Sequence, residues 1–138
     1  MEMTNGRTLI ERYIDTINQR HWDEFDELFA PEYRYHGASI GAGEHTPPEA
    51  VKRYFHYLIN AFPDLHMRAD LMIVTDEYVV LRWAANGTHQ GEYMGLPATG
   101  RHGEQAGISI WRLAHGRFVE GWQNQDDLGL VQSATAPR

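Results

Sequence analysis

The sequence predicts an α+β fold in which helices pack on one face of a curved sheet. Apolar residues recur with a helical period as far as Phe62, and with a period of two after Asp64. Helices followed by strands are typical of α+β folds, whereas a parallel sheet needs the two to alternate. The 138 residues, of which 42% are hydrophobic, suit a single domain over residues 1–138.

Three helices are expected in the first half of the chain. The first covers residues 8–20, where five apolar residues recur at helical spacing. A shorter helix follows over residues 22–29. The third begins with a capping box, because Thr46 can cap it and Glu49 lies three residues further on. Pro63 prevents this helix from continuing.

Extended segments are expected on both sides of the third helix. Before it, the segment EYRYHG is a short extended stretch that leads into a glycine-rich loop. Four strands are predicted in LHMRADLMIVT, YVVLRWAANGTHQ, QAGISIWRLAHG and RFVEGWQNQ, which are rich in β-branched and aromatic residues. A tight hairpin at His115-Gly116 favours consecutive antiparallel strands. The tail over residues 133–138 is expected to be disordered.

Composition excludes several classes of function. The absence of cysteine rules out disulfides, thiolate zinc sites, iron–sulfur clusters and a cysteine nucleophile. A net charge of -7 without a basic cluster argues against nucleic-acid binding. The eight histidines show no metal-ligand spacing, so no metal site is expected. The negative charge leaves a neutral or weakly polar small molecule as the expected partner. The sequence shows neither an apolar span nor a signal peptide, which predicts a cytoplasmic protein without membrane contact.

Two adjacent acids, Asp126 and Asp127, follow the last expected strand, and two interpretations are open. One acid can cap a final helix over DDLGLVQ, because Asp is a favoured N-cap residue. Alternatively, one acid does chemistry. Alternation along the strand places Trp122, Asn124 and Asp126 on one face, and this mixture suits a mostly apolar pocket with a few polar groups.

Four other residues are candidates for the site, each with a structural alternative. His36 and His89 end extended segments and titrate near neutrality, although a hydrogen-bonded edge position also explains them. Arg82 lies in the apolar run VVLRWAA. If it is buried, it should contact a carboxylate or the substrate, and the alternative is a position on an exposed sheet face. Trp83 is expected in the core or in a pocket wall.

The chain resembles the SnoaL-like polyketide cyclases from Thr8 to about Gln132. The matching segments are AFPDLHM, GTHQGEYMGLPATG, GISIWRLAHGRFVEGW and DDLGLVQ, in the family's order and spacing. The resemblance implies that the helices wrap the antiparallel sheet into a cone with a deep apolar pocket. It also implies a homodimer or larger homo-oligomer and no metal or organic cofactor. The family's acid–base residue precedes a Leu-Gly-Leu run and matches Asp126, whereas Asp127 matches a variable position.

The reaction that the resemblance implies is intramolecular aldol ring closure of a polyketide-type ester. Asp126 would then transfer the protons, with His36, His89 and Asn124 as candidate donors to the enolate oxygen. Trp83 and Trp122 would be pocket walls.

Two alternatives remain open on the same fold. One is an isomerase or an epoxide-opening cyclase or hydrolase, for which Tyr93 and His102 are plausible acids. The other is a noncatalytic module for small-ligand binding or dimerisation.

Overall fold

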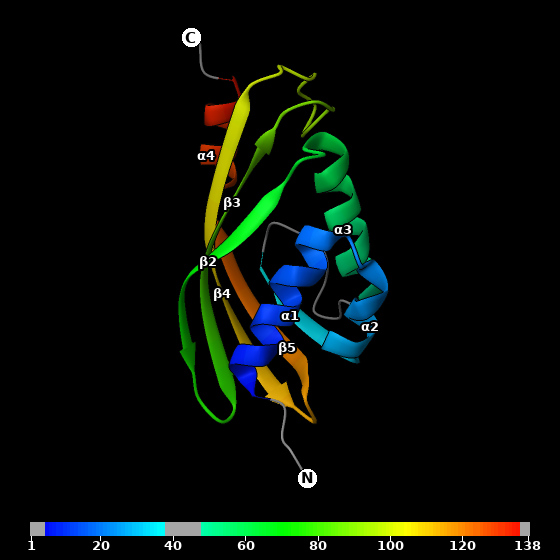
Figure 1. Ribbon diagram of the computed structural model, residues 1–138, viewed down its shortest axis with the longest axis vertical. Coiled ribbons are helices and arrows are strands. Elements are labelled where there is room, and N and C mark those ends of the chain that lie inside the picture. The colour runs from blue at the N-terminus through cyan, green and yellow to red at the C-terminus, as the bar shows by residue number, and fades with distance from the viewer. Residues whose placement is uncertain (1–4, 38–47, 136–138) are drawn as a thin grey trace.

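The computed structural model of the protein describes residues 5–37 and 48–135 (Figure 1). In chain order, its elements are α1 (Gly6–Gln19), η1 (Trp22–Glu24), α2 (Phe25–Leu28), β1 (Phe29–His36), α3 (Pro48–Ala61), β2 (His66–Val74), β3 (Tyr78–Thr88), β4 (His102–Ala114), β5 (Arg117–Gln125) and α4 (Asp127–Thr135). The expected α+β class is confirmed, and so is the final helix. The predicted capping residue of α3, Thr46, lies outside the described residues.

The strands form one curved sheet in the order β1-β5-β4-β3-β2. Neighbouring strands from β2 to β5 are antiparallel, as the sequence predicts. In contrast, β1 pairs with β5 in the parallel direction, with an irregular register between Phe29 and Arg34. The sheet therefore differs from the expected one at this edge, because EYRYHG belongs to a full strand whose partner lies near the other end of the chain.

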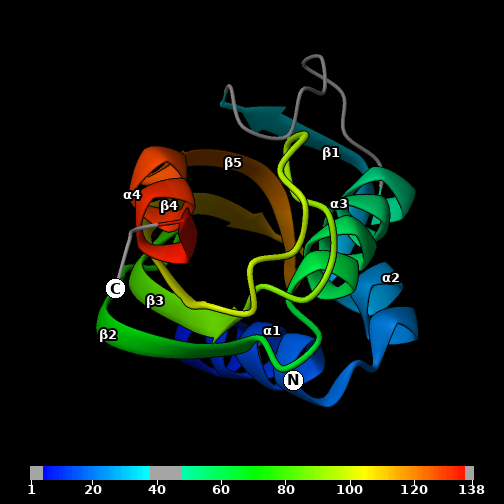
Figure 2. The same cartoon turned by 90° about the horizontal axis from the view of Figure 1, so that it is seen from above.

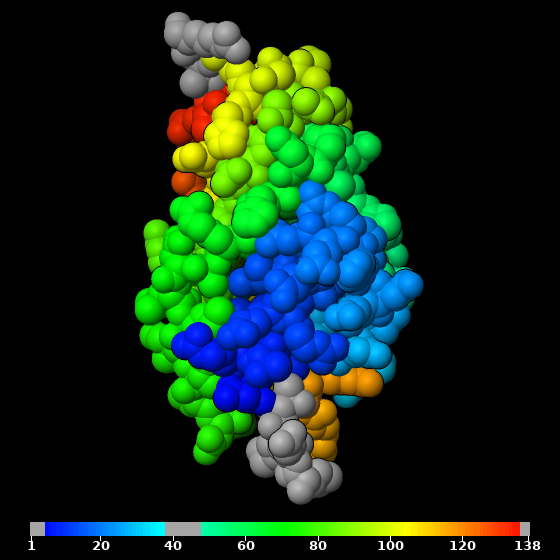
Figure 3. Space-filling view, in the orientation of Figure 1, coloured from blue at the N-terminus to red at the C-terminus, as the bar shows by residue number. Residues whose placement is uncertain are grey.

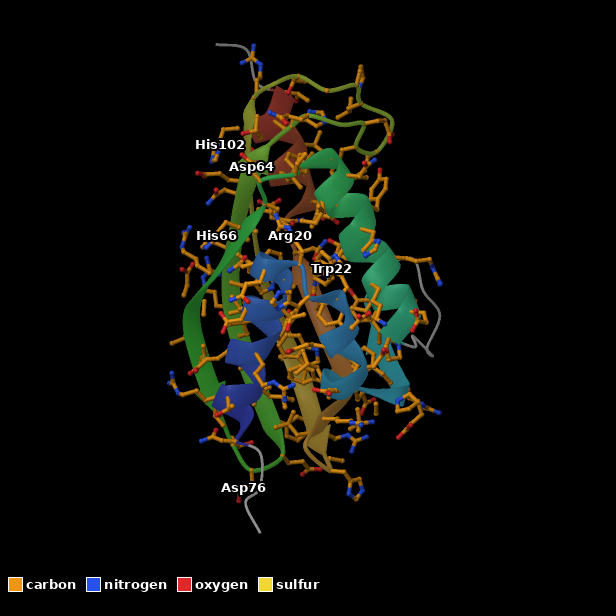
Figure 4. All side chains as sticks on the ribbon, turned by 45° about the vertical axis from the view of Figure 1, so that its right-hand side comes forward. Arg20, Trp22, Asp64, His66, Asp76 and His102 are labelled. Carbon is orange, nitrogen blue, oxygen red and sulfur yellow. The ribbon has the colours of Figure 1, made fainter. Side chains whose placement is uncertain are left out.

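Helix α1 is fixed at both of its ends. At its start, the side chain of Asn5 accepts a hydrogen bond from a backbone N–H of the first turn (2.8 Å). At its end, Arg20 adopts the left-handed conformation, with φ of 64°. The Arg20 guanidinium donates to the carbonyls of Pro63 and Leu65, which joins α1 to the turn before β2 (Figure 4).

The core lies on the concave side of the sheet. The odd-numbered residues from 79 to 87 in β3 and from 103 to 111 in β4 are buried there. Helix α1 packs against β2 and β3, while α3 lies across the interior from the sheet (Figure 2). Tyr13 of α1 packs in the centre, with its ring centroid 5.0 Å from that of Trp111 and 6.2 Å from that of Phe55. The space-filling view shows α1 and α2 in the middle of this side of the molecule, with β2 beside them (Figure 3).

Helix α4 packs against β4 at one end of the sheet (Figure 1). Leu130 and Ala134 are buried, and a side chain added at Gly103 would meet the Leu130 methyl group at 2.9 Å. Ser133 Oγ accepts a hydrogen bond from the backbone N–H of Glu104 (2.9 Å). The expectation of a disordered tail is therefore wrong for residues 133–135, and residues 136–138 lie outside the described residues. No helix within the described ranges is long and apolar enough to cross a membrane.

Candidate active site inside the cone

Four polar side chains interrupt the apolar inner face of β4 and β5. Gln105 and Ser109 point inward from β4 and are 4% and 1% exposed. On β5, Gln123 lies opposite Ser109 in the ladder, and Gln125 lies one inward position further along. Because buried amides and hydroxyls need hydrogen-bond partners, these side chains must bond to one another or to a ligand.

These side chains form a continuous row of hydrogen bonds that ends on a carboxylate. The indole Nε1 of Trp83 donates to Ser109 Oγ (3.1 Å), and Ser109 Oγ donates to Gln123 Oε1 (3.0 Å). Gln123 Nε2 donates to Gln125 Oε1. Finally, Gln125 Nε2 donates to Asp127 Oδ1 (2.8 Å). We call this row the interior hydrogen-bond chain.

The direction of the interior hydrogen-bond chain is fixed by its two ends. An indole N–H only donates and a carboxylate only accepts, so each glutamine must present its oxygen toward Trp83 and its nitrogen toward Asp127. Gln105 Nε2 donates to the same Asp127 oxygen from β4 (2.7 Å). Two amides thus hold Oδ1, while no described residue forms a hydrogen bond with Oδ2 of Asp127.

Asp126 caps the final helix, and Asp127 is the neighbouring acid that reaches the interior. Asp126 is exposed, and its Oδ1 accepts a hydrogen bond from the backbone N–H of Gly129 (2.7 Å), which caps α4. Asp127 is half-buried and reaches the interior. The expectation that Asp126 lies in the pocket is therefore wrong. The inner side of β5 holds the odd-numbered residues 121, 123 and 125, and Asp127 continues that series.

Two small cavities border the interior hydrogen-bond chain among the described residues. One, of about 20 Å³, lies between Tyr33, Trp111 and Tyr54. The other, of about 10 Å³, is lined by Tyr54, Gln105 and Gln125. Each has room for about one water molecule, so these walls must move apart before either space admits a larger ligand. In place of the deep apolar pocket that the resemblance implies, this part of the interior is narrow and partly polar.

Two tyrosines stand close to the Asp127 carboxylate. The hydroxyl of Tyr54 accepts a hydrogen bond from Gln125 Nε2 (2.9 Å). Burial raises the pKa of Tyr54 well above its usual value. Burial and, secondly, the charge of Asp127 raise the pKa of Tyr93 to about 12. Both phenols therefore keep their protons at neutral pH, where they can donate hydrogen bonds but cannot act as bases.

His89 lies on the inner side, just beyond β3, and is 1% exposed. Its Nδ1 is 3.1 Å from Thr99 Oγ1, and Thr99 donates its own proton to the Ala134 carbonyl (2.6 Å). Nδ1 must therefore carry the histidine proton, which leaves Nε2 as an acceptor. Nε2 has no hydrogen-bond partner among the described residues, and the ring stacks on Phe62.

Several of the other residues expected in the site lie on the outer face of the sheet. His36 Nε2 contacts Glu120 (2.8 Å), and the His36 ring stacks on Trp122 with centroids 5.3 Å apart. Arg82 and Asn124 are exposed, which corrects their expected contact with substrate and favours the exposed-face alternative for Arg82. Trp122 is likewise not a wall of the described cavities, whereas Trp83 lines the smaller one.

His102 is also placed outside the interior. Its side chain is 57% exposed and lies 3.8 Å from Glu104, and Figure 4 shows it at the outer edge of the sheet. Tyr93, in contrast, is buried as a pocket residue would be. No three His, Asp or Glu side chains are grouped as a metal site requires in the part of the chain that the structure describes.

Sequence reasoning did not select Tyr54, Gln105 or Asp127 for the site. The alternation of polar residues at positions 123, 125 and 127 was the available signal for the inner side of β5. No such signal exists for Tyr54, because tyrosine on an apolar helix stripe is usually a core residue.

Comparisons with known proteins show what the sequence is similar to. A sequence model of the SnoaL-like polyketide cyclases matches residues 7–133. The chain is 28% identical over 140 residues to the aklanonic acid methyl ester cyclase DnrD of Streptomyces peucetius, covering 98% of this chain and 94% of DnrD. It is also 28% identical to the aklanonic acid methyl ester cyclase DauD of Streptomyces sp. (strain C5), covering 94% of this chain and 81% of DauD.

Solved structures share the fold. The crystal structure of IdmH from Streptomyces antibioticus superposes with a TM-score of 0.79 at 28% identity, over 91% of this chain and 94% of IdmH. TsrD from Streptomyces laurentii superposes with a TM-score of 0.84 at 24% identity, over 99% of both chains. The cone-shaped arrangement of helices on a curved sheet is therefore that of these proteins.

Proposed function

The chain belongs to the SnoaL-like polyketide cyclase family, and we propose that it closes a ring in a polyketide-type ester by cofactor-free intramolecular aldol addition. We infer that Asp127, in place of Asp126, is its acid–base group. One observation carries this proposal: Asp127 is the carboxylate on the inner side, with Oδ1 held by two amides and Oδ2 bonded to no described residue.

Aldol ring closure needs one group that first takes and then returns a proton. Oδ2 of Asp127 removes a proton from the carbon between two carbonyls, and the electron pair of the broken C–H bond forms the enolate. The enolate carbon attacks a second carbonyl of the same molecule, which forms the C–C bond and leaves an alkoxide. Asp127 then returns its proton to the alkoxide, so the enzyme ends in its starting state.

The interior hydrogen-bond chain supports this role by fixing the carboxylate. Gln105 and Gln125 hold Oδ1 from two neighbouring strands, so Oδ2 has a defined direction. Neutral amides orient the acid without competing for the proton, since an amide does not titrate. A fixed base and a folded substrate lower the entropic cost of ring closure at the barrier.

The experiment compares Asp127→Asn with Asp126→Asn, which remove the same charge from neighbouring residues. Aklanonic acid methyl ester is the first substrate to test, because the relatives DnrD and DauD are cyclases of that ester. We expect Asp127→Asn to lower kcat by about 10²-fold or more, the usual contribution of a general acid–base group. Asp126→Asn should stay close to the wild type, because Asn also caps a helix. Retained turnover in Asp127→Asn would contradict the proposal.

We also propose that two copies of the chain associate through the outer face of the sheet. Ile73, Val80, Ile110 and Trp122 lie in register across β2, β3, β4 and β5, and Ile73 and Ile110 are 52% and 37% exposed. Leu71 and Ile108 are exposed on the same face, with Arg82 between them in the ladder. An exposed apolar row of this kind marks an interaction surface, and most homo-oligomers pair the same patch on each copy.

A further inference from the structure

We propose that the Tyr54 hydroxyl binds the substrate carbonyl oxygen next to the carbon from which Asp127 takes its proton. This inference rests on the proposed function and adds a second catalytic residue to it. Tyr54 would donate a hydrogen bond to an oxygen that becomes negatively charged as the enolate forms. The pair Tyr54–Asp127 therefore selects a substrate whose acidic C–H group is adjacent to a carbonyl.

The first support is the amide that Tyr54 and Asp127 share. Gln125 Nε2 lies 2.9 Å from the Tyr54 hydroxyl oxygen and 2.8 Å from Asp127 Oδ1. The two oxygens are therefore at most the sum of these distances apart, about 5.7 Å. Oδ2, the proposed base, belongs to the same carboxylate as Oδ1. A carbonyl oxygen can therefore contact the Tyr54 hydroxyl while the C–H of the neighbouring carbon faces Oδ2.

The second support is the free proton of Tyr54. The hydroxyl oxygen already accepts a hydrogen bond from Gln125, and no described residue accepts the hydroxyl proton. An O–H group whose oxygen accepts a hydrogen bond is a stronger donor, because the two bonds polarise each other. Gln125 thus holds the phenol in place and leaves its proton available for a ligand.

The third support is the position of Tyr54 in the interior. Tyr54 lines both described cavities, so its ring stands between the space beside Gln125 and the space beside Trp111. Burial raises the pKa of the Tyr54 phenol, which keeps it protonated throughout the neutral range. A protonated phenol on the wall of such a cavity is suited to stabilise an enolate oxygen.

The chemical step balances without any further reactant. The C–H bond breaks, its proton moves to Asp127 Oδ2, and its electron pair forms the carbon–carbon double bond of the enolate. The carbonyl π electrons move to the oxygen, which accepts the hydrogen bond from Tyr54. When the enolate carbon attacks, the carbonyl group reforms and the hydrogen bond weakens. Tyr54 keeps its proton throughout.

The test is Tyr54→Phe, with Tyr57→Phe as the matched control. Tyr57 lies on the same helix, and its hydroxyl accepts a hydrogen bond from the Met94 backbone N–H at an exposed site (2.7 Å). The assay follows ring closure of aklanonic acid methyl ester and exchange of its α-proton with D₂O. We expect Tyr54→Phe to lower kcat and the exchange rate by about 10²-fold, as for the loss of one oxyanion donor. KM should change much less, and Tyr57→Phe should match the wild type.

The outcomes separate this inference from the proposed function. If Tyr54→Phe retains kcat and exchange while Asp127→Asn loses both, the inference is wrong and the proposed function stands. If Asp127→Asn retains activity, or if the wild type shows neither closure nor exchange, both fail. Should Tyr54→Phe not fold, Gln125→Met serves as the second variant. It leaves Tyr54 and Asp127 in place but removes the amide that aligns them, so unchanged kcat and exchange would overturn the inference.

Discussion

The Asp126 carboxylate accepts a hydrogen bond from the backbone N–H of Gly129 (2.7 Å), so this acid closes the first turn of α4. Its neighbour Asp127 bonds to Gln105 and Gln125 in the interior instead. One peptide bond therefore separates an acid that stabilises a helix from an acid in the candidate active site. The two acids should respond differently to the same substitution.

The cap predicts a loss of stability in Asp126→Ala. Removing the side-chain oxygen leaves a backbone N–H of α4 without its partner, so the free energy of unfolding should fall by about 1 kcal/mol. Asp126→Asn should lose only part of this, because its amide oxygen still accepts the bond. Urea unfolding of both variants checks the prediction, and equal stability of Asp126→Ala and the wild type would contradict it.

The two amides at Asp127 predict that Gln105→Glu is unstable at neutral pH. The new carboxylate would stand where an amide donor now lies 2.7 Å from Asp127 Oδ1. Because two close carboxylates cannot both ionise readily, the variant should lose about 1–3 kcal/mol of unfolding free energy at pH 7. Lowering the pH should restore part of this loss, since one carboxyl then holds a proton that bridges the pair.

Gln105→Met is the control for that substitution, because it removes the same donor without adding a charge. Its loss of stability should not depend on pH between neutral and mildly acid conditions. If Gln105→Glu and Gln105→Met show the same pH dependence in urea unfolding, the side chain of residue 105 does not face Asp127 in solution.

The contacts of Glu120 on the outer face predict that this residue contributes to folding stability, and that the contribution is lost in acid. Hydrogen bonds from His36 and Arg112 lower the pKa of Glu120 below its ordinary value of 4.5. A lowered carboxyl pKa stabilises the folded state above the unfolded pKa, and this stabilisation disappears as the pH falls through the folded pKa. Glu120→Gln should therefore be about 1 kcal/mol less stable at pH 7. The difference from the wild type should vanish well below pH 4.5.

The proposed dimer predicts that Ile110→Asp is monomeric. Ile110 lies in the middle of the apolar row across the outer face, so a charge there would have to be buried between two copies. Met94→Asp is the control, because Met94 is 61% exposed in the loop after β3, away from that row. Sedimentation of the wild type, Ile110→Asp and Met94→Asp checks the prediction, and a monomeric wild type would refute the dimer.

Local signals in the sequence predicted most elements correctly. The helical stripe over residues 8–20 corresponds to α1, Pro63 lies just beyond α3, and the period of two after Asp64 corresponds to β2 to β5. These signals depend on neighbours in the chain, so they can be read without the fold. The parallel pairing of β1 with β5 depends on residues far apart in sequence, and no local pattern reveals it.

The inner and outer faces of β5 were assigned the wrong way round for a physical reason. Alternation divides a strand into two faces but does not say which one is buried. The aromatic side chain of Trp122 led to the prediction that its face of β5 is the inner one. Its ring packs instead on His36 on the outer face of the sheet. Gln123 and Gln125 lie on the inner face instead, where they satisfy one another through the interior hydrogen-bond chain.

The adjacency of Asp126 and Asp127 also has an evolutionary consequence. Losing or gaining one residue at the end of β5 would turn the neighbouring acid toward the interior and leave the other to begin α4. Relatives that retain a single aspartate at this junction need not aim it in the same direction. Alignment gaps here are best placed by the alternation of the preceding strand, because the Leu-Gly-Leu run alone does not say whether the acid before it faces the interior.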